Sequence, residues 1–148
     1  MDAVLQASRA LVAVAARSLA QVEGNVTIPQ YRAMVVLASR GPQTAGGLAD
    51  SLRIHLSTLT RLCDRLVAKG LITREEERNN RRRVTLSLTQ RGKQLVRSVT
   101  ARRRDEIAAI VGRVPPVQRE DMVAALRAFG DAAGEPADSS WAPEWFAG

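Results

Sequence analysis

The residue type with the clearest chemistry in this sequence is arginine. Four arginines fall within six positions near the middle of the chain, in the run Arg78-Asn79-Asn80-Arg81-Arg82-Arg83. Guanidinium groups stay charged and donate paired hydrogen bonds, which suits phosphate oxygens and the O6 and N7 atoms of guanine. Just before this run, residues 44–69 show the pattern of two short helices joined by a turn. A helix that fits the major groove, next to a basic hairpin, indicates binding to duplex DNA.

The second of these helices, from about His55 to Lys69, has two distinct faces. At 100° per residue, its leucines and Cys63 gather on one side. The other side and its shoulders carry short hydroxyls and arginines, which permit close approach to base edges. An ordinary solvent-exposed helix would look similar, and Glu75–Glu77 could neutralise part of the hairpin. The predicted DNA contacts are Thr44, His55, Ser57, Thr58, Thr60, Arg61, Arg65, Arg78, Arg81, Arg82 and Arg83.

Enzymatic chemistry is not indicated by the sequence. The single histidine and single cysteine, His55 and Cys63, are about 12 Å apart along a helix that rises about 1.5 Å per residue. That separation excludes a direct hydrogen bond, and one histidine with one cysteine cannot build the usual zinc site. The sequence also lacks a glycine-rich phosphate loop. We therefore expect no catalytic residues, no cofactor and no metal. Cys63 is predicted to be a core residue, with redox sensing as the alternative.

The charge distribution favours a polyanionic partner. The formal net charge is +7, and between residues 40 and 91 eleven basic residues stand against five acidic ones, a net +6. A single cysteine excludes an internal disulfide and is consistent with a reducing compartment. On inspection, no apolar run approaches the roughly 20 residues of a membrane span, and the first helix carries Arg9 and Arg17 within its apolar pattern. We expect a cytoplasmic protein without a membrane segment.

The periodicity of the sequence predicts a mainly α fold with a small β-hairpin wing. Thr27, Thr44 and Thr89 stand where helix-capping hydroxyls belong, and Gly70 stands where a helix ends. Predicted helices cover about residues 2–23, 27–41, 44–52, 55–69, 90–113 and 117–133, and predicted strands cover 71–77 and 83–88.

The two ends of the chain carry more apolar helix surface than one small lobe can bury. This predicts a dimer formed through the N- and C-terminal helices. The tail holds Trp141, Trp145 and Phe146, which we expect to dock on this helical layer or on the partner subunit. The predicted division is an N-terminal dimerisation helix (1–28), a winged helix-turn-helix DNA-binding lobe (29–89), C-terminal dimerisation helices (90–134) and a tail (135–148).

Three segments of the sequence resemble one known family. They are Thr44-x-x-x-Leu48-Ala49, then Leu59-Thr60-Arg61-Leu62-x-x-Arg65-Leu66-x-x-x-Gly70-Leu71-Ile72, then Arg81-Arg82 leading to Val84-x-Leu86-x-Leu88-Thr89-x-x-Gly92. Over about residues 28–130, the chain is similar to the MarR family of bacterial winged-helix regulators. The resemblance implies a homodimer that places its recognition helices in successive major grooves of a pseudo-palindromic operator. It also implies wings that reach the flanking minor grooves.

The resemblance further implies a transcriptional regulator, most often a repressor. Many members of the family lose DNA affinity when a small aromatic or phenolic compound binds between the dimer layer and the DNA-binding lobes. Others respond to thiol oxidation or to metals. If this chain has such an effector, we expect its pocket where the first, second and fifth helices meet, near Leu11, Tyr31, Met34 and Leu95.

The chain departs from the family pattern at several positions. Asn80 and Arg82 stand where the wing often has an Asp-x-Arg pair, and Arg53 and His55 stand where the turn usually has glycine and then serine or threonine. The first helix has no cysteine, which argues against thiol sensing. Two other function classes remain open from the sequence. One is an architectural, sequence-tolerant DNA-binding protein, and the other is a winged-helix module that binds an acidic protein partner.

Overall fold

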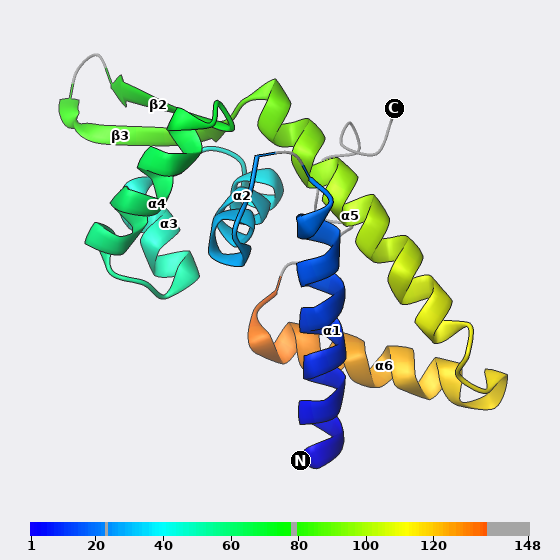
Figure 1. The fold of residues 1–148 in the computed structure, drawn as a ribbon. Helices are drawn as coiled ribbons and strands as arrows, with labels where there is room; N and C mark the ends of the chain where they lie inside the picture. The colour runs from blue at the N-terminus through cyan, green and yellow to red at the C-terminus, as the bar shows by residue number, and fades with distance from the viewer. Residues whose placement is uncertain (23, 78–79, 136–148) are drawn as a thin grey trace.

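The computed structural model describes residues 1–22, 24–77 and 80–135. Helices α2, α3 and α4 and a small sheet form a lobe near the start of α5, while α1, α5 and α6 extend away from it (Figure 1). The mainly α winged helix-turn-helix fold predicted from the sequence is confirmed. In chain order the elements are α1 (Asp2–Ala20), α2 (Ile28–Arg40), β1 (Gln43–Thr44), α3 (Ala45–Leu52), α4 (Leu56–Ala68), β2 (Ile72–Glu77), β3 (Asn80–Leu88), α5 (Gln90–Val111) and α6 (Pro116–Ala133).

The sheet has one strand more than the sequence predicts. It is antiparallel with three strands, in the order β1-β3-β2. The additional strand, β1, has only two residues, with Gln43 opposite Leu86 and Thr44 opposite Thr85. Two residues cannot show the alternation that marks a longer strand, so the pattern misses them. The pairing ties the start of the helix-turn-helix to the central strand of the wing.

The lobe has a continuous hydrophobic core that holds α4 and the sheet against the start of α5. Its largest fully buried side chains come from six helices and strands that are spread along the sequence. They are Met34 on α2, Leu48 on α3, Leu59 and Leu66 on α4, Ile72 and Leu86 on the sheet, and Val96 and Val99 on α5. Because these side chains interlock, the recognition elements are presented on a rigid support.

The junction between the wing and α5 is closely packed around Gly92. The Thr89 hydroxyl caps α5 by accepting from the Gly92 amide at 3.0 Å, and it donates to the Gly70 carbonyl at 2.7 Å. A Cβ atom placed on Gly92 would lie 2.1 Å from the carbonyl oxygen of Leu71. Only glycine fits in this space, and the base of the wing packs directly against the start of α5.

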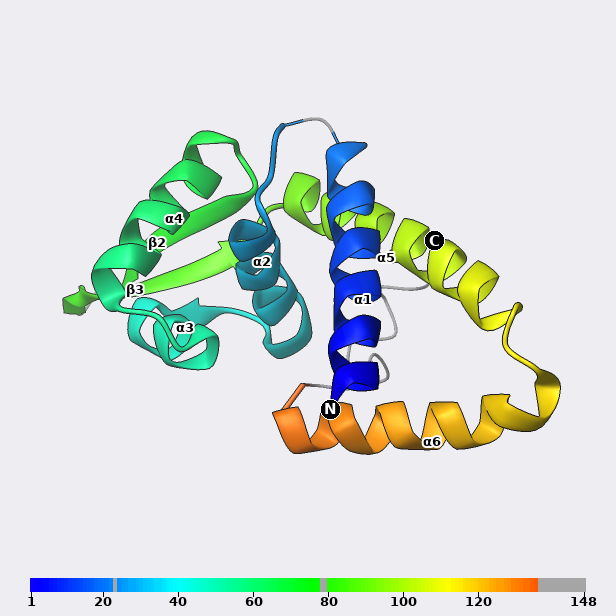
Figure 2. The ribbon, with the colours of Figure 1, turned by 60° about the horizontal axis from the view of Figure 1, so that its bottom comes forward.

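The three remaining helices form an open frame beside the lobe. Figures 1 and 2 show α6 folding back from the far end of α5 and passing the N-terminal half of α1. None of the residues of α6, all of which the structure describes, is buried. Large apolar side chains of the frame are exposed instead: Val4, Leu5, Leu11 and Val12 on α1, and Val117, Val123, Leu126 and Phe129 on α6.

Helix α1 corrects one expectation from the sequence. In length and mean hydropathy its 19 residues are comparable to a membrane-spanning helix, although the sequence predicted no such stretch. Arg9 and Arg17 interrupt the apolar pattern without lowering the average below that of a span. Only 17% of the helix window is buried in this structure. Signal sequences and helices of soluble proteins also share these properties, so length and composition do not assign α1 to a membrane.

Candidate DNA-binding surface

Helix α4 has the two faces predicted from its sequence. Leu59, Leu62, Cys63 and Leu66 are buried against the lobe. The opposite side is open to solvent, and within the described chain no hydrogen bond or ion pair to the guanidinium groups on this side is found. The predicted contact residues that are exposed here are His55, Ser57, Thr58, Thr60, Arg61 and Arg65. The lobe thus presents hydroxyls and free cations along one helix.

Two of the predicted contact hydroxyls already have partners inside the protein. The Thr44 hydroxyl caps α3 by accepting a hydrogen bond from the Gly47 amide at 3.1 Å. The Thr60 hydroxyl donates to the Leu56 carbonyl at 2.9 Å, one turn earlier in α4. A hydroxyl that is bonded to its own helix has less capacity for a base edge. Ser57 and Thr58 are therefore the better placed of the hydroxyl residues on α4.

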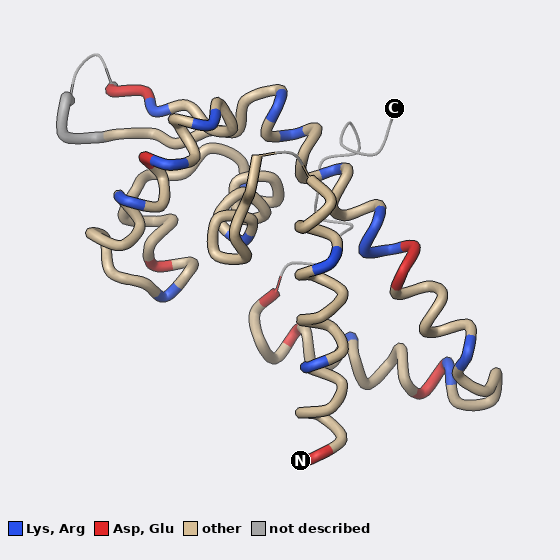
Figure 3. Tube along the Cα trace, in the orientation of Figure 1, with Lys and Arg blue, Asp and Glu red and all other residues tan. Residues whose placement is uncertain are grey.

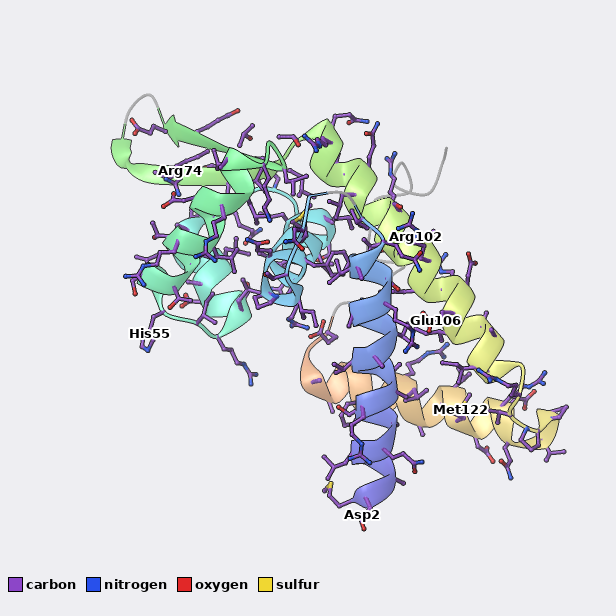
Figure 4. The ribbon with its side chains drawn as sticks, viewed as in Figure 1. Asp2, His55, Arg74, Arg102, Glu106 and Met122 are labelled. Carbon is purple, nitrogen blue, oxygen red and sulfur yellow. The ribbon has the colours of Figure 1, made fainter. Side chains whose placement is uncertain are left out.

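The turn between α3 and α4 contains a backbone conformation that is unusual for its residue type. Arg53 has φ 53° and ψ 44°, in the left-handed region, and its amide closes α3 by donating to the carbonyls of Ala49 and Asp50. This region costs an L-residue about 1–2 kcal/mol relative to glycine. His55 follows as the N-cap of α4 without a side-chain capping bond. Figure 4 shows its imidazole directed away from the lobe.

The hairpin of the wing is irregular where its arginines lie. Glu75 pairs with Thr85 and Glu76 with Val84, but Glu77 then pairs with Asn80. Residues 81–83 of β3 therefore have no partners on β2 and form a bulge between the Glu76–Val84 pair and the Glu77–Asn80 pair. Glu75 and Glu76 therefore stand opposite neutral residues and not opposite arginines. The side chains of residues 81–83, and the whole of Arg78, lie outside the described residues.

An ion pair that sequence analysis missed joins the wing to the recognition helix. Arg74 on β2 donates through Nη2 to Asp64 Oδ1 on α4 at 2.8 Å. Figure 4 shows Arg74 between the hairpin and that helix. The two residues are ten positions apart on different elements, so no periodic pattern links them. The pair helps to set the angle between the wing and α4, although both side chains are more than one third exposed.

The C-terminal end of α4 is also held in place. Lys69 donates through Nζ to the carbonyl of Asn25 at 2.8 Å and to Gln30 Oε1 at 3.3 Å. Gln30 is buried and forms a capping box with Thr27 at the start of α2. Lys69 therefore links the recognition helix to the segment that connects α1 with α2. Two cations of the motif, Lys69 and Arg74, act within the protein.

Comparison with known proteins decides the family. The MarR family model matches residues 26–84. The HTH-type transcriptional regulator FarR of Neisseria gonorrhoeae is 32% identical over 113 residues, which cover 74% of this chain and 77% of FarR. The chain belongs to the MarR family. It is a DNA-binding transcriptional regulator and not an enzyme.

Solved structures agree with this assignment. The crystal structure of RV1404 from Mycobacterium tuberculosis is 47% identical, with a TM-score of 0.86 and 93% of each chain covered. A mutant of MepR from S. aureus, bound to an oligodeoxyribonucleotide, is 23% identical with a TM-score of 0.68, over 90% of this chain and 98% of MepR. The second likeness concerns the fold alone.

Within this MarR family fold, many of the basic residues lie on the lobe and on α5. Figure 3 shows basic residues on the helix-turn-helix, on the hairpin and along much of α5. Those on α5 are Arg91, Lys93, Arg97, Arg102, Arg103 and Arg104. Acidic residues are interspersed, and Arg17 on α1 pairs through Nε with Glu106 on α5 at 2.7 Å. The described basic surface therefore extends from α4 toward the frame.

Cys63 is a core residue of this MarR family member. Its side chain is buried, and burial raises the pKa of its thiol from 9.0 to about 11. The nearby Arg74 lowers that pKa, and Asp64 raises it further, but burial dominates. Because the thiolate is the reactive form, the thiol is poorly reactive near neutral pH.

The four residues predicted to line an effector pocket fall into two environments. Tyr31, Met34 and Leu95 are buried in the lobe core, whereas Leu11 on α1 is exposed. The Tyr31 hydroxyl lies 3.1 Å from the Thr100 hydroxyl on α5. Three residues further along α5, the Nε atom of Arg103 is buried without a hydrogen-bond partner among the described residues. The hydroxyls of Tyr31 and Thr100 therefore place polar groups at the contact of α2 with α5.

Proposed function

We propose that the protein is a homodimeric repressor that binds a pseudo-palindromic DNA operator. In this proposal α4 enters the major groove, and the wing arginines reach the adjacent minor groove. The carrying observation is the exposed face of α4, where Arg61 and Arg65 stand beside short hydroxyls and next to the wing. A helix of this kind reads base edges, while the wing favours the narrow minor groove of A·T tracts.

The homodimer is supported by the apolar surface of the frame. Leu126 and Phe129 on α6 and Leu5 on α1 are each about half exposed or more in the single chain. Large apolar patches of this kind on a soluble chain mark interaction surfaces. A two-fold dimer through α1 and α6 would bury them and give two recognition helices related by symmetry, as a palindromic site requires. Light scattering at micromolar concentration tests this, and a monomeric mass would contradict it.

The operator is tested by gel-shift titration. The DNA would be a palindromic segment from upstream of the protein's own gene, with a shuffled duplex as the control and bulk competitor DNA present. Selective binding to the palindromic duplex supports the proposed operator, whereas equal binding to both duplexes or absence of binding would contradict it. A transcription assay with the bound promoter separates a repressor, which lowers transcript yield, from an activator.

A small aromatic acid or phenol is the proposed effector class. The Tyr31 and Thr100 hydroxyls meet at the contact of α2 with α5, and Arg103, three residues further along α5, has a buried Nε atom without a hydrogen-bond partner among the described residues. Hydroxyl and guanidinium groups are the donors that a phenolate or carboxylate needs. To release DNA, the compound must bind more tightly to a lobe spacing that misfits the operator, since equal affinity for both spacings shifts nothing. Isothermal titration of salicylate, with Arg103→Met as the variant, measures this; no binding to either protein favours a ligand-independent regulator.

The proposed division of labour follows the sequence prediction. Residues 1–28 and 90–134 would form the dimer layer, and residues 29–89 the DNA-binding lobe. Residues 135–148 would form a tail, whose aromatic residues Trp141, Trp145 and Phe146 lie outside the described residues. A regulator that acts on chromosomal DNA works in the cytoplasm of a bacterium, and fractionation of cells that express the protein tests that location.

A further inference from the structure

Arg53 combines an unfavourable backbone conformation with an unused charge. Within the described residues, only Asn25 and Arg53 among non-glycine residues have positive φ, at 51° and 53°. Asparagine tolerates the left-handed region well, whereas arginine does not share that tolerance. Glycine would adopt the same turn with less strain. The residue type at position 53 is therefore not explained by the folding of the turn.

The guanidinium of Arg53 gains nothing from the rest of the protein that would offset this strain. Arg53 is exposed, and within the described parts of the chain its side chain makes no hydrogen bond or ion pair. Arg40, which lies close to the same helix, is in contrast engaged with the Ser51 hydroxyl at 2.9 Å. A local outlier of this kind indicates a functional gain outside the folded chain.

The position of the turn indicates what that gain is. In a helix-turn-helix, the first helix crosses the DNA backbone and the second enters the major groove with its N-terminal residues. The turn between α3 and α4 therefore passes over a phosphate strand at the edge of the groove. His55, two residues after Arg53, is exposed at the N-cap of α4 and points away from the lobe in Figure 4. The next charged groups that Arg53 would meet in a complex are phosphates.

We propose that Arg53 is a phosphate-binding residue that positions α4 on the DNA backbone. It would supply a charge-assisted hydrogen bond from the turn, where a glycine has no side chain to offer. The contact carries no sequence information, because phosphates are the same at every base pair. It rests on the DNA binding of this family and adds to the contacts of α4 and the wing. The chain thus gives up some stability at this turn in exchange for DNA affinity.

The test uses three substitutions at one position and a matched control elsewhere. Arg53→Gly removes both the strain and the charge. Arg53→Asn removes the charge and introduces a side chain that tolerates positive φ, and Arg53→Lys keeps the charge. Asn25→Gly changes the other positive-φ residue, which lies in the segment between α1 and α2. Each full-length variant is measured for its melting temperature and for its binding to operator and shuffled DNA across a salt series.

Arg53→Gly is expected to move stability and affinity in opposite directions. Its melting temperature should rise by about 2–4 °C, and its DNA affinity should fall about tenfold. The loss should be equal for operator and shuffled DNA, and the log–log salt slope should fall by about one for each bound protomer. Arg53→Asn should show the same loss of affinity and slope. Arg53→Lys should retain the slope, and Asn25→Gly should leave DNA binding unchanged.

Two results would overturn the proposal. One is that both Arg53→Gly and Arg53→Asn bind DNA with wild-type affinity and salt slope, while Arg61→Ala still alters binding. Arg53 would then have a structural role only and no contact with DNA. The other is a loss confined to operator DNA, which would assign Arg53 to a base edge. If Arg61→Ala also has no effect, the assignment of the DNA-binding surface fails, and that failure is distinguishable from the failure of Arg53.

Discussion

The lobe and the two outer helices of the frame, α1 and α6, differ in how much of their apolar surface is buried. The lobe buries its large side chains inside one chain, with Leu48, Leu59 and Leu66 fully enclosed. Helix α6 buries none of its residues, and Leu5 and Val12 on α1 are about half exposed. Exposed apolar surface on this scale is unfavourable in water, which supports the proposal that a second copy of the chain covers it. Substitutions in the lobe should therefore change stability at every protein concentration, whereas substitutions in the frame should change how stability depends on protein concentration.

The largest contrast is expected between one core leucine of the lobe and one aromatic residue of the frame. Leu48→Ala removes a fully buried side chain and should lower the free energy of unfolding by about 2–5 kcal/mol at every protein concentration. Phe129→Ala removes a side chain that is 62% exposed in the single chain. It should instead weaken the dimer and make the melting temperature depend more strongly on protein concentration.

The measurement is thermal unfolding over a hundredfold range of concentration, with light scattering in parallel. If the Phe129→Ala protein remains a dimer and melts as the wild type does, the proposed role of α6 in the dimer is contradicted. In that case α6 would face solvent, and the dimer would have to form elsewhere.

Two glycines sharpen the same comparison. A Cβ on Gly92 would collide with the Leu71 backbone, so Gly92→Ala should destabilise the protein by about 1–3 kcal/mol or more. A Cβ on Gly130, in the last turn of α6, meets nothing within 4 Å. Gly130→Ala should therefore stabilise the helix by about 0.5–1 kcal/mol. Denaturant unfolding of both variants checks the signs, and a destabilised Gly130→Ala dimer would instead place this position against the partner.

The sequence predicts the lobe well because its signals are local. The capping residues Thr27, Thr44 and Thr89 each make the expected capping bond, and the apolar face of α4 is the buried one. What the sequence could not predict depends on contacts between distant residues. Strand β1 exists through its pairing with β3, and the Arg74–Asp64 pair requires two elements to be packed first.

The wing shows the limit of pattern analysis most clearly. Strict alternation predicted a strand that begins at Arg83, whereas β3 begins at Asn80 and its ladder shifts register before Val84. A bulge places the extra residues on one strand without changing residue composition, so hydropathy does not reveal it. Arg53 is intermediate, since its departure from the family residue was visible in the sequence but its left-handed backbone was not.

Within the lobe, the recognition helix and the wing should differ in what they read. Arg61→Ala should cost about 1–3 kcal/mol on the operator and relax discrimination at one position of the half-site, as loss of a base contact does. Arg82→Ala should weaken binding and flatten the preference for A·T flanks, because a narrow minor groove attracts guanidinium. Neither change should affect the dimer. Binding to operator and shuffled DNA across a salt series separates the two, and wild-type selectivity in both variants would mean that the DNA-facing surface is misassigned.

The smallest effect on DNA binding is expected from oxidation. This experiment tests whether oxidants in solution can reach the Cys63 thiol in the core of the lobe. At neutral pH the Cys63 thiol is buried and protonated, so an organic hydroperoxide should leave DNA binding unchanged. The pKa of about 11 in the folded protein lies above the ordinary value of 9.0. The contribution of this thiol to stability is therefore fully present below pH 9. It is lost as the pH rises from 9 toward 11, since the unfolded chain releases the proton first.

A disulfide-exchange reagent measures this directly, with Cys63→Ala as the control for changes that do not involve the thiol. Modification of the folded protein should be slow at pH 7 and should accelerate steeply above pH 9, while unfolded protein should react at once. This prediction would be overturned if the wild-type protein is modified rapidly at pH 7 and loses operator binding, while the Cys63→Ala protein treated in the same way keeps it. That result would make the lobe core accessible to oxidants and would turn Cys63 from a packing residue into a sensor.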